Sequence, residues 1–398
     1  MFETKSSKTT PSGLAFTHNP AVLECPELPG GIAPGGVYPL RVEIDGKNVF
    51  SGRCSFPYFI NIAEIVDAFT PPIPDISEGV PVNGMPSLVC VEDYDMMTRR
   101  EVYAFIDAEA DDELGFFAIP GGVSRQNLRI FNGNDSDVFK ERFLATDRNF
   151  FFSTRAATWR LVLKETEIAP LYFITDSPAS FAVKELATDR ELKVDSLIPG
   201  IYALDIDALR RHFFEMGVLA SVFDIYRDSK FACRIVIERA QPAPERLILK
   251  FRNSLGVFEL MELTGSPEIF ADWQTAEEAL FDSYDKIVDD FACARERIPA
   301  SRTVNVSSGF KSSSELAFML DMLSSEEVWL LGLAEMPVRV IPTAEDFSFS
   351  SRPTTPKSVA LTLRLVDDDA NIMPDISEDG ADFKRRRVFS KHFSKHFN

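Results

Sequence analysis

The sequence lacks the short motifs that mark the main classes of enzyme active site. It contains no G-x-S-x-G, no Walker loop, no G-x-G-x-x-G and no H-E-x-x-H, and so offers no nucleophile elbow, phosphate cradle or zinc-binding helix. Histidine is scarce as well. Of the four His, His392 and His396 lie close to the C-terminus, and His212 sits on a predicted helix where we interpret it as a surface or packing residue. We therefore expect a protein that is not an enzyme and uses no cofactor.

The sequence has few cysteines and no long apolar run. The five Cys are odd in number, widely spaced and never arranged as C-x-x-C, which favours free thiols in a reducing compartment over a disulfide framework. No apolar run approaches transmembrane length. The polar stretch 1–13 lacks the apolar core of a signal peptide. These features predict a protein without a transmembrane segment that is made and folded in a cytoplasm.

Positive charge is sparse except at the C-terminus. The chain has 42 Lys and Arg against 61 Asp and Glu, a net charge of −19. Because an acidic surface repels phosphates, we expect no general nucleic-acid binding. Residues 384–398 reverse the sign with six basic residues and no acidic one. Without them the chain has 36 basic and 61 acidic residues, a net charge of −25.

This basic segment contains a tandem F-S-K-H repeat over residues 389–396. One interpretation is a disordered basic end. The other is a docking peptide that orders on binding an acidic neighbouring subunit, with its three Phe at i, i+4 and i+8 on one face of a helix. The residues expected to dock are Arg385, Arg386, Arg387, Phe389, Lys391, Phe393, Lys395 and Phe397.

Tyrosine and tryptophan are rare, whereas phenylalanine is abundant. There are 34 Phe, 8 Tyr and 3 Trp. Phe packs without needing a hydrogen-bond partner, so this bias favours strand and interface burial over a polar binding cleft. A carbohydrate-binding surface needs exposed Trp or Tyr. Trp159 and Trp329 lie in apolar strands and are expected in the core, which leaves Trp273 as the one candidate ligand platform.

Several acidic segments could in principle offer carboxylates to a cation. We interpret Glu92–Asp95 and Asp367–Asp369 as solvated turns, as is usual for neighbouring acids. Residues 375–380 imitate the start of a calcium loop, but the closing glutamate position is occupied by Arg386. We therefore predict no metal site. The pentapeptide P-D-I-S-E occurs at 74–78 and again at 374–378, a repetition for which the sequence offers no physical reason.

Local patterns predict strands, turns and a few helices. Alternation broken by Asp45-Gly46 predicts a hairpin over 38–50, and a second hairpin is predicted over 246–265. Strands that run directly into short helices are expected at 59–69 and 200–216, a weak internal repeat. Ser312 and Glu315 form a capping box that begins a helix.

This order of elements predicts a mainly β fold with a few short helices, arranged as tandem β-sandwich-like domains. Six segments are expected. They are a flexible arm (1–13), an N-terminal β-sandwich-like domain (14–113), a connecting β segment (114–169), a second β-sandwich-like domain (170–265), a C-terminal α+β domain (266–370), and a linker with a basic docking tail (371–398).

Several segments taken together resemble structural proteins from the tail region of phages and prophages of the Bacteroides group. The segments that carry the resemblance are 16–20, 42–46, 49–52, 60–65, 119–125, 143–144, 149–159, 249–259, 308–310, 323–329 and 337–340. The resemblance implies a virion structural protein of the tail, tail tip, baseplate or neck ring. Its implied partners are copies of itself and other virion proteins, and its implied location is the virion, after synthesis in the host bacterial cytoplasm.

Three functions are compared on this basis. A structural assembly protein explains the Phe excess, the strands and the basic tail, and it works by burying apolar surface between subunits. The alternative is a carbohydrate-binding or adhesin module at the host surface, which requires an exposed Trp273. A hydrolase rests only on the abundance of acids and would hold two carboxylates in a cleft.

Overall fold

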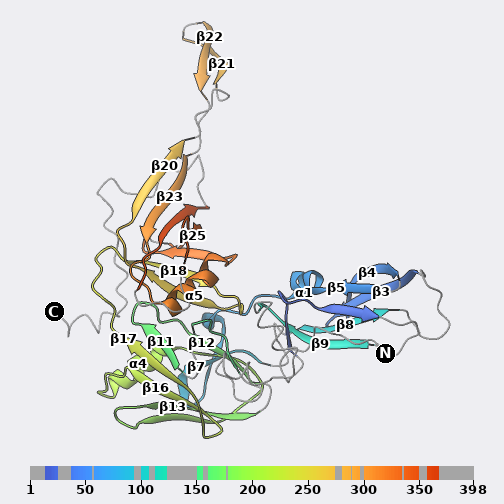
Figure 1. The fold of residues 1–398 in the computed structure, drawn as a ribbon, viewed down its shortest axis with the longest axis vertical. Helices are drawn as coiled ribbons and strands as arrows, with labels where there is room; N and C mark the ends of the chain where they lie inside the picture. The colour runs from blue at the N-terminus through green and yellow to red at the C-terminus, as the bar shows by residue number, and fades with distance from the viewer. Residues whose placement is uncertain are drawn as a thin grey trace. The chain divides into compact units, whose positions relative to one another are not determined.

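The computed structural model describes residues 14–25, 37–55, 58–93, 100–106, 113–122, 150–155, 160–175, 178–273, 280–287, 289–295, 300–333, 336–348 and 356–366. Within these residues the chain is mainly β, with several antiparallel sheets and three short α-helices (Figure 1). The mainly β fold predicted from the sequence is therefore confirmed.

The chain divides into two compact units. Unit 1 comprises Met1–Lys164, Ile168–Arg239 and Arg252–Glu259, and unit 2 comprises Glu165–Glu167, Ala240–Phe251 and Leu260–Asn398. Each unit is therefore assembled from segments that are separate in the sequence. The domain boundaries expected at residues 113, 169, 265 and 370 concern contiguous segments, and they stay predictions.

The first sheet of unit 1 has a hairpin at one edge. Its strand order is β1 (Leu14–Phe16), β9 (Glu113–Ile119), β8 (Arg100–Ile106), β3 (Val37–Ile44) and β4 (Lys47–Ser55). Asp45 and Gly46 join β3 to β4 with φ of 51° and 70°, the left-handed pair that a two-residue hairpin turn needs. Leu40, Val42 and Ile44 are buried, as expected of alternate positions on one face. The hairpin predicted at 38–50 is confirmed.

The second sheet of unit 1 has central strands that are buried on both faces. Its strand order is β10 (Phe150–Phe151), β12 (Leu171–Thr175), β15 (Gly200–Leu204), β7 (Met85–Asp93) and β6 (Val80–Val82). Leu171 and Phe173 enter one hydrophobic cluster, whereas Tyr172 and Ile174 enter another. Because successive side chains of a strand point to opposite faces, both clusters draw on the same strand. This double burial explains why four successive residues of β12, Leu171–Ile174, are apolar or aromatic.

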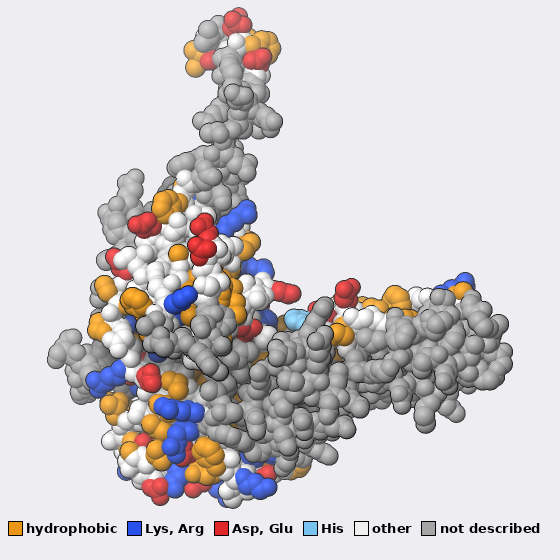
Figure 2. Space-filling model, in the orientation of Figure 1, with side chains coloured by type: hydrophobic (Ala, Val, Ile, Leu, Met, Phe, Trp, Pro, Cys, Tyr) orange, Lys and Arg blue, Asp and Glu red, His pale blue; other side chains and the backbone are white. Residues whose placement is uncertain are grey.

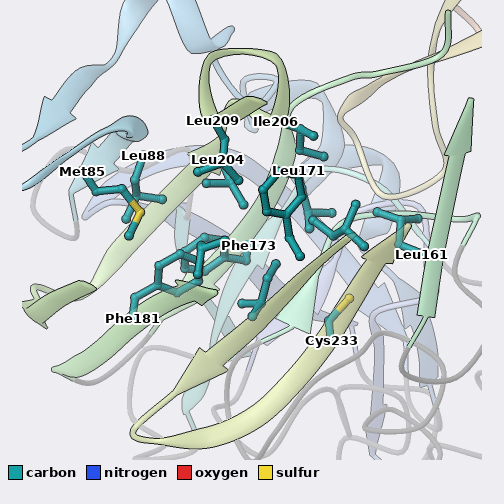
Figure 3. Packing of buried hydrophobic residues seen from close by; sticks show 14 of the residues in the cluster. Met85, Leu88, Leu161, Leu171, Phe173, Phe181, Leu204, Ile206, Leu209 and Cys233 are labelled. Carbon is teal, nitrogen blue, oxygen red and sulfur yellow. The ribbon is translucent and has the colours of Figure 1, made fainter. Parts of the chain in front are cut away.

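A third sheet packs against the second around one of these clusters. Its strand order is β11 (Arg160–Lys164), β17 (Lys230–Glu238), β16 (Val222–Arg227), β13 (Ala179–Glu185) and β14 (Glu191–Leu197). Phe181 of β13 stacks on Phe173 of β12 with ring centroids 4.9 Å apart (Figure 3). Helix α4 (Ile206–Glu215) adds Leu209 and Phe213 to the cluster. The two sheets and the helix form a sandwich-like arrangement.

The two predicted strand–helix units are confirmed. Strand β5 (Tyr58–Asn61), which pairs with β2 (Val22–Cys25), leads directly into α1 (Ala63–Phe69). Strand β15 leads into α4, whose first turn is capped by Asp205: its carboxylate accepts from Ala208 N at 2.9 Å. Capping of this kind satisfies one of the backbone N–H groups that have no partner within the helix.

Residues 71–86, in which Pro and Gly recur, are not wholly a loop. This segment contains a 3-10 helix η1 (Ile76–Glu78) and the edge strand β6. Pro81 is tolerated in β6 because an edge strand need not donate every N–H. Asp75 Oδ1 accepts from Ser77 N at 3.1 Å and from Ser77 Oγ at 2.9 Å. The first copy of P-D-I-S-E is therefore a turn that the Asp75 side chain stabilises. The second copy lies outside the described residues.

Unit 2 is built around a seven-stranded sheet and one helix. The strand order is β19 (Phe258–Leu263), β18 (Leu247–Arg252), β24 (Val328–Leu331), β25 (Val338–Thr343), β26 (Ala360–Leu365), β23 (Ala300–Ser307) and β20 (Glu268–Trp273). Helix α5 (Ser313–Leu323) begins at the predicted capping box of Ser312 and Glu315. It buries Phe318 against Phe251 in the core, with ring centroids 5.1 Å apart. The predicted hairpin over 246–265 is confirmed as β18 and β19.

Candidate functional site

The residues predicted to dock a partner lie outside the described part of the structure. They are Arg385, Arg386, Arg387, Phe389, Lys391, Phe393, Lys395 and Phe397. Trp273 is the last residue of β20, but its side chain is also outside the description. Trp329 is half-buried in β24, and its indole N–H donates to Glu327 Oε1 at 3.0 Å. Trp329 was expected in the core, but it lies between the buried Val328 and Leu330 and is only half-buried, so it is not one of the buried core residues of unit 2.

One buried asparagine holds the loop between β18 and β19. Asn253 Oδ1 accepts from Leu255 N at 3.0 Å and from Val257 N at 3.2 Å. Its Nδ2 donates to Phe152 O at 3.3 Å and to Glu259 Oε2 at 2.7 Å. Asparagine suits this position because its side chain carries both an acceptor and donors. The loop therefore has a fixed shape that presents Leu255 and Val257 to a hydrophobic cluster.

Glu259 of β19 is buried and surrounded by donors. One oxygen accepts from Ser153 Oγ at 2.7 Å. The other accepts from Thr154 N and Thr154 Oγ1 at 3.2 Å each, as well as from Asn253. Burying a carboxylate costs free energy unless it is hydrogen-bonded, and these four bonds supply the compensation. We interpret Glu259 as a structural carboxylate that ties β19 to the segment after β10.

We expect Glu259→Gln to lower the free energy of unfolding of unit 1 by about 2 kcal/mol, because a neutral amide oxygen accepts the bonds from Thr154 and Asn253 less strongly than the carboxylate does. Glu191→Gln on the exposed edge strand β14 is the matched control and should have little effect. Urea unfolding followed by circular dichroism measures both variants. Equal stability of the two variants would show that the Glu259 bonds do not hold the fold.

Two glycines let this loop meet the segment that follows β9. Gly121 has φ of 105° and Gly256 has φ of 87°. A Cβ on Gly121 would lie 2.7 Å from Ser254 O, and a Cβ on Gly256 would lie 3.0 Å from Pro120 O. Gly122 N donates to Ser254 O at 2.5 Å. Backbone thus packs directly on backbone, which only glycine permits at these two positions.

The segment after β9 also binds the residues that follow β1. Thr17 N donates to Ile119 O at 2.9 Å, and His18 N donates to Gly121 O at 2.8 Å. His18 Nε2 lies 3.4 Å from Asp67 Oδ1, with both side chains about half exposed. An exposed pair of this kind contributes little to stability. The backbone bonds, rather than the histidine side chain, define this contact.

Four segments that are distant in the sequence therefore meet in unit 1. We call this place the loop junction and define it as residues 16–19, 119–122, 152–154 and 253–259. Sequence reasoning identified turns and strands in these segments, but it did not identify Asn253 or Glu259 as buried polar residues. Gly121, Gly256 and Asn253 are the residues whose types could have indicated a tightly packed loop.

A second buried polar group, which we call the buried ion cluster, lies in unit 2. It consists of Thr166, Glu167, Arg246, Glu262 and Lys311. Lys311 Nζ donates to Glu262 O at 2.8 Å and lies 3.9 Å from Glu167 Oε1. Glu262 Oε2 accepts from Thr166 Oγ1 at 2.6 Å and lies 2.8 Å from Arg246 Nε. Glu167 Oε1 accepts from Glu262 N at 2.8 Å.

The buried polar side chains of the loop junction and of the buried ion cluster bind other parts of the fold. In the loop junction and in the buried ion cluster, the carboxylates bond to backbone, hydroxyl or cationic groups of the fold. The Lys311, Glu167 and Glu262 side chains are only 1–2% exposed, so a substrate in solvent does not reach them. Within the part of the chain that the structure describes, no group of three or more His, Cys, Asp or Glu is placed to hold a metal ion.

Cys233 on β17 is a buried free thiol. Burial raises the pKa of this thiol to about 12, so at neutral pH it stays protonated and unreactive. We expect Cys233 to resist a thiol reagent in the folded protein and to react once urea unfolds unit 1. Mass spectrometry of labelled peptides measures this. Rapid labelling of Cys233 in the native protein would contradict the burial.

An open hairpin is the most exposed apolar element of unit 2 that the description covers. It consists of β21 (Leu280–Asp285) and β22 (Asp290–Arg295), which lie between β20 and β23 in the sequence and, among the described strands, pair only with each other. Tyr284, Ile287 and Phe291 are 48%, 94% and 69% exposed. Tyr284 and Phe291 pair across the strands, edge to face, with ring centroids 5.5 Å apart.

Acidic groups accompany these exposed side chains. Four Asp stand against one Lys and one Arg between Leu280 and Arg295. In Figure 2, hydrophobic and acidic side chains lie next to each other on the element that Figure 1 labels β21 and β22. The Tyr284 hydroxyl donates to Asp289, which raises the pKa of Tyr284. This hairpin was not predicted from the sequence, since neither of its strands alternates between apolar and polar residues.

Comparison with models of protein families gives no match, and comparison with curated proteins gives no match either. No helix in the described residues is long and apolar enough to cross a membrane.

Proposed function

We propose that the protein is a non-enzymatic structural protein of a phage virion, from the tail, tail tip, baseplate or neck ring, and that it works by contact between subunits. The observation that carries this proposal is the open hairpin. A two-stranded hairpin is marginally stable alone in water. This one also exposes Tyr284, Ile287 and Phe291, side chains that gain free energy when a partner removes them from water.

The buried polar groups support the same proposal. Asn253 and Glu259 fix a loop, and Lys311 fixes Glu167 and the backbone of Glu262. Groups of this kind specify and stiffen a fold. A fixed fold with an exposed apolar hairpin is suited to an assembly in which each subunit must present the same surface to its neighbours.

The oligomeric state of the full-length protein tests the proposal. We expect light scattering to show a defined multimer whose mass falls when Ile287→Ser and Phe291→Ser are combined. Met336→Ser, at another exposed apolar side chain of unit 2, is the matched control and should leave the mass unchanged. An antibody against the protein should also label the tail region of phage particles.

A monomer at every concentration would contradict assembly through self-contact. The host-surface adhesin would then be the better hypothesis, and Trp273→Ala should abolish binding to a glycan array. A multimer insensitive to the two hairpin substitutions would keep self-assembly but remove the hairpin from it. Circular dichroism of each variant establishes that the fold is intact.

A further inference from the structure

We propose that the open hairpin receives the C-terminal F-S-K-H repeat of a neighbouring copy, which adds to it as a third strand. This inference rests on the proposed function, because it names the partner of the hairpin within the assembly. The hairpin offers what strand addition requires. Its two strands pair only with each other among the described strands, so their outer edges present backbone N–H and C=O groups to a further strand.

The charges of the two elements are complementary. The hairpin carries Asp282, Asp285, Asp289 and Asp290 against Lys286 and Arg295, a balance of −2. Residues 384–398 carry six basic residues and no acidic one. Opposite charges direct association and disfavour wrong partners. Because the rest of the chain is acidic, residues 384–398 are the segment whose charge best complements the hairpin.

The apolar side chains match as well. One face of the hairpin carries the Tyr284–Phe291 pair, and Asp282 lies on the same face because it precedes Tyr284 by two residues. In an extended repeat, Phe389, Lys391, Phe393, Lys395 and Phe397 also recur at intervals of two and share a face. Phe would then pack on the aromatic pair while Lys approaches Asp282, the strand aspartate on this face.

Peptide binding tests this inference. The probe is a labelled synthetic peptide of residues 384–398, measured by fluorescence anisotropy. The receptor is the full-length chain in which Phe389, Phe393 and Phe397 are changed to Ser, so that its own tail does not compete. We expect saturable binding that weakens by about tenfold or more when Ile287→Ser and Phe291→Ser are added. Met336→Ser should leave binding unchanged.

A second peptide tests the extended geometry. Exchanging Lys with the following His in each repeat, to give F-S-H-K, keeps composition and charge. In a strand this moves Lys to the face opposite Phe, whereas in a helix it brings Lys closer to the Phe stripe. We expect the exchanged peptide to bind more weakly. Equal or tighter binding would overturn strand addition, and binding insensitive to the hairpin substitutions would overturn the hairpin as receptor.

Mixing distinguishes a neighbour's tail from the chain's own. One full-length variant carries the three Phe→Ser changes in the tail, and the other carries Ile287→Ser and Phe291→Ser. We expect light scattering to show a complex in the mixture that neither variant forms alone, since one supplies the intact hairpin and the other the intact tail. Absence of this complex, with peptide binding intact, would assign the contact to a single chain and overturn the exchange between copies.

The outcomes separate this inference from the proposed function. A wild-type multimer that does not bind the peptide would overturn the tail as occupant and leave assembly standing. A wild-type monomer whose hairpin binds the peptide would support the contact and overturn assembly.

Discussion

Gly121→Ala should destabilise unit 1 by about 3 kcal/mol or more, because the substitution adds backbone strain and a steric clash together. Gly121 has φ of 105°, a conformation that residues with a Cβ rarely adopt. The added Cβ would lie 2.7 Å from Ser254 O. The loop of Asn253 would have to move away, which would weaken its bonds to Glu259 and Phe152.

Gly217→Ala is the matched control for this prediction. Gly217 has φ of 81°, but a Cβ there would meet no atom within 4 Å. We therefore expect only the backbone cost of about 1 kcal/mol. Urea unfolding gives the two free energies, and hydrogen exchange of peptides from β9 and β12 locates the change. If both variants lose the same stability, backbone conformation alone accounts for Gly121, and the close packing at the loop junction contributes nothing.

Local signals in the sequence predicted local structure well. Asp45 and Gly46 predicted the β3–β4 hairpin because a two-residue turn needs left-handed residues. Ser312 and Glu315 predicted the start of α5 because a capping box is complete within four residues. The mainly β fold follows from many such short patterns. Each of these depends on neighbours in the sequence, so a single chain is enough to recognise it.

The arrangement of distant segments could not be predicted in the same way. The Glu259 carboxylate accepts hydrogen bonds from Ser153 and Thr154, which lie more than a hundred residues earlier. Nothing in the sequence of either segment indicates that the two are in contact. Nothing in the sequence of β12 indicates that its sheet lies between two hydrophobic clusters. The open hairpin was missed because its significance comes from the absence of a third described strand, a property of the sheet and not of its sequence.

Lys311→Met should destabilise unit 2 by about 3–5 kcal/mol, the usual cost of removing one partner of a buried ion pair. The Lys311 side chain is 2% exposed, donates to Glu262 O and lies near Glu167. Methionine has a similar volume, so the change removes charge and a hydrogen bond rather than packing. Glu167 would then be left beside an apolar side chain while remaining buried. Urea unfolding with hydrogen exchange of peptides from β18 and β24 measures the loss.

Two further variants decide whether charge causes this loss. Lys357→Met is the matched control because its backbone pairs with Lys311 while its side chain is exposed, and we expect an effect of at most about 0.5 kcal/mol. Adding Glu167→Gln to Lys311→Met should restore part of the stability, since Gln can still accept from Glu262 N but carries no charge. A double variant less stable than Lys311→Met would show that Glu167 acts through its hydrogen bond alone. Recovery would instead identify the buried ion cluster as a charge-balanced support of unit 2.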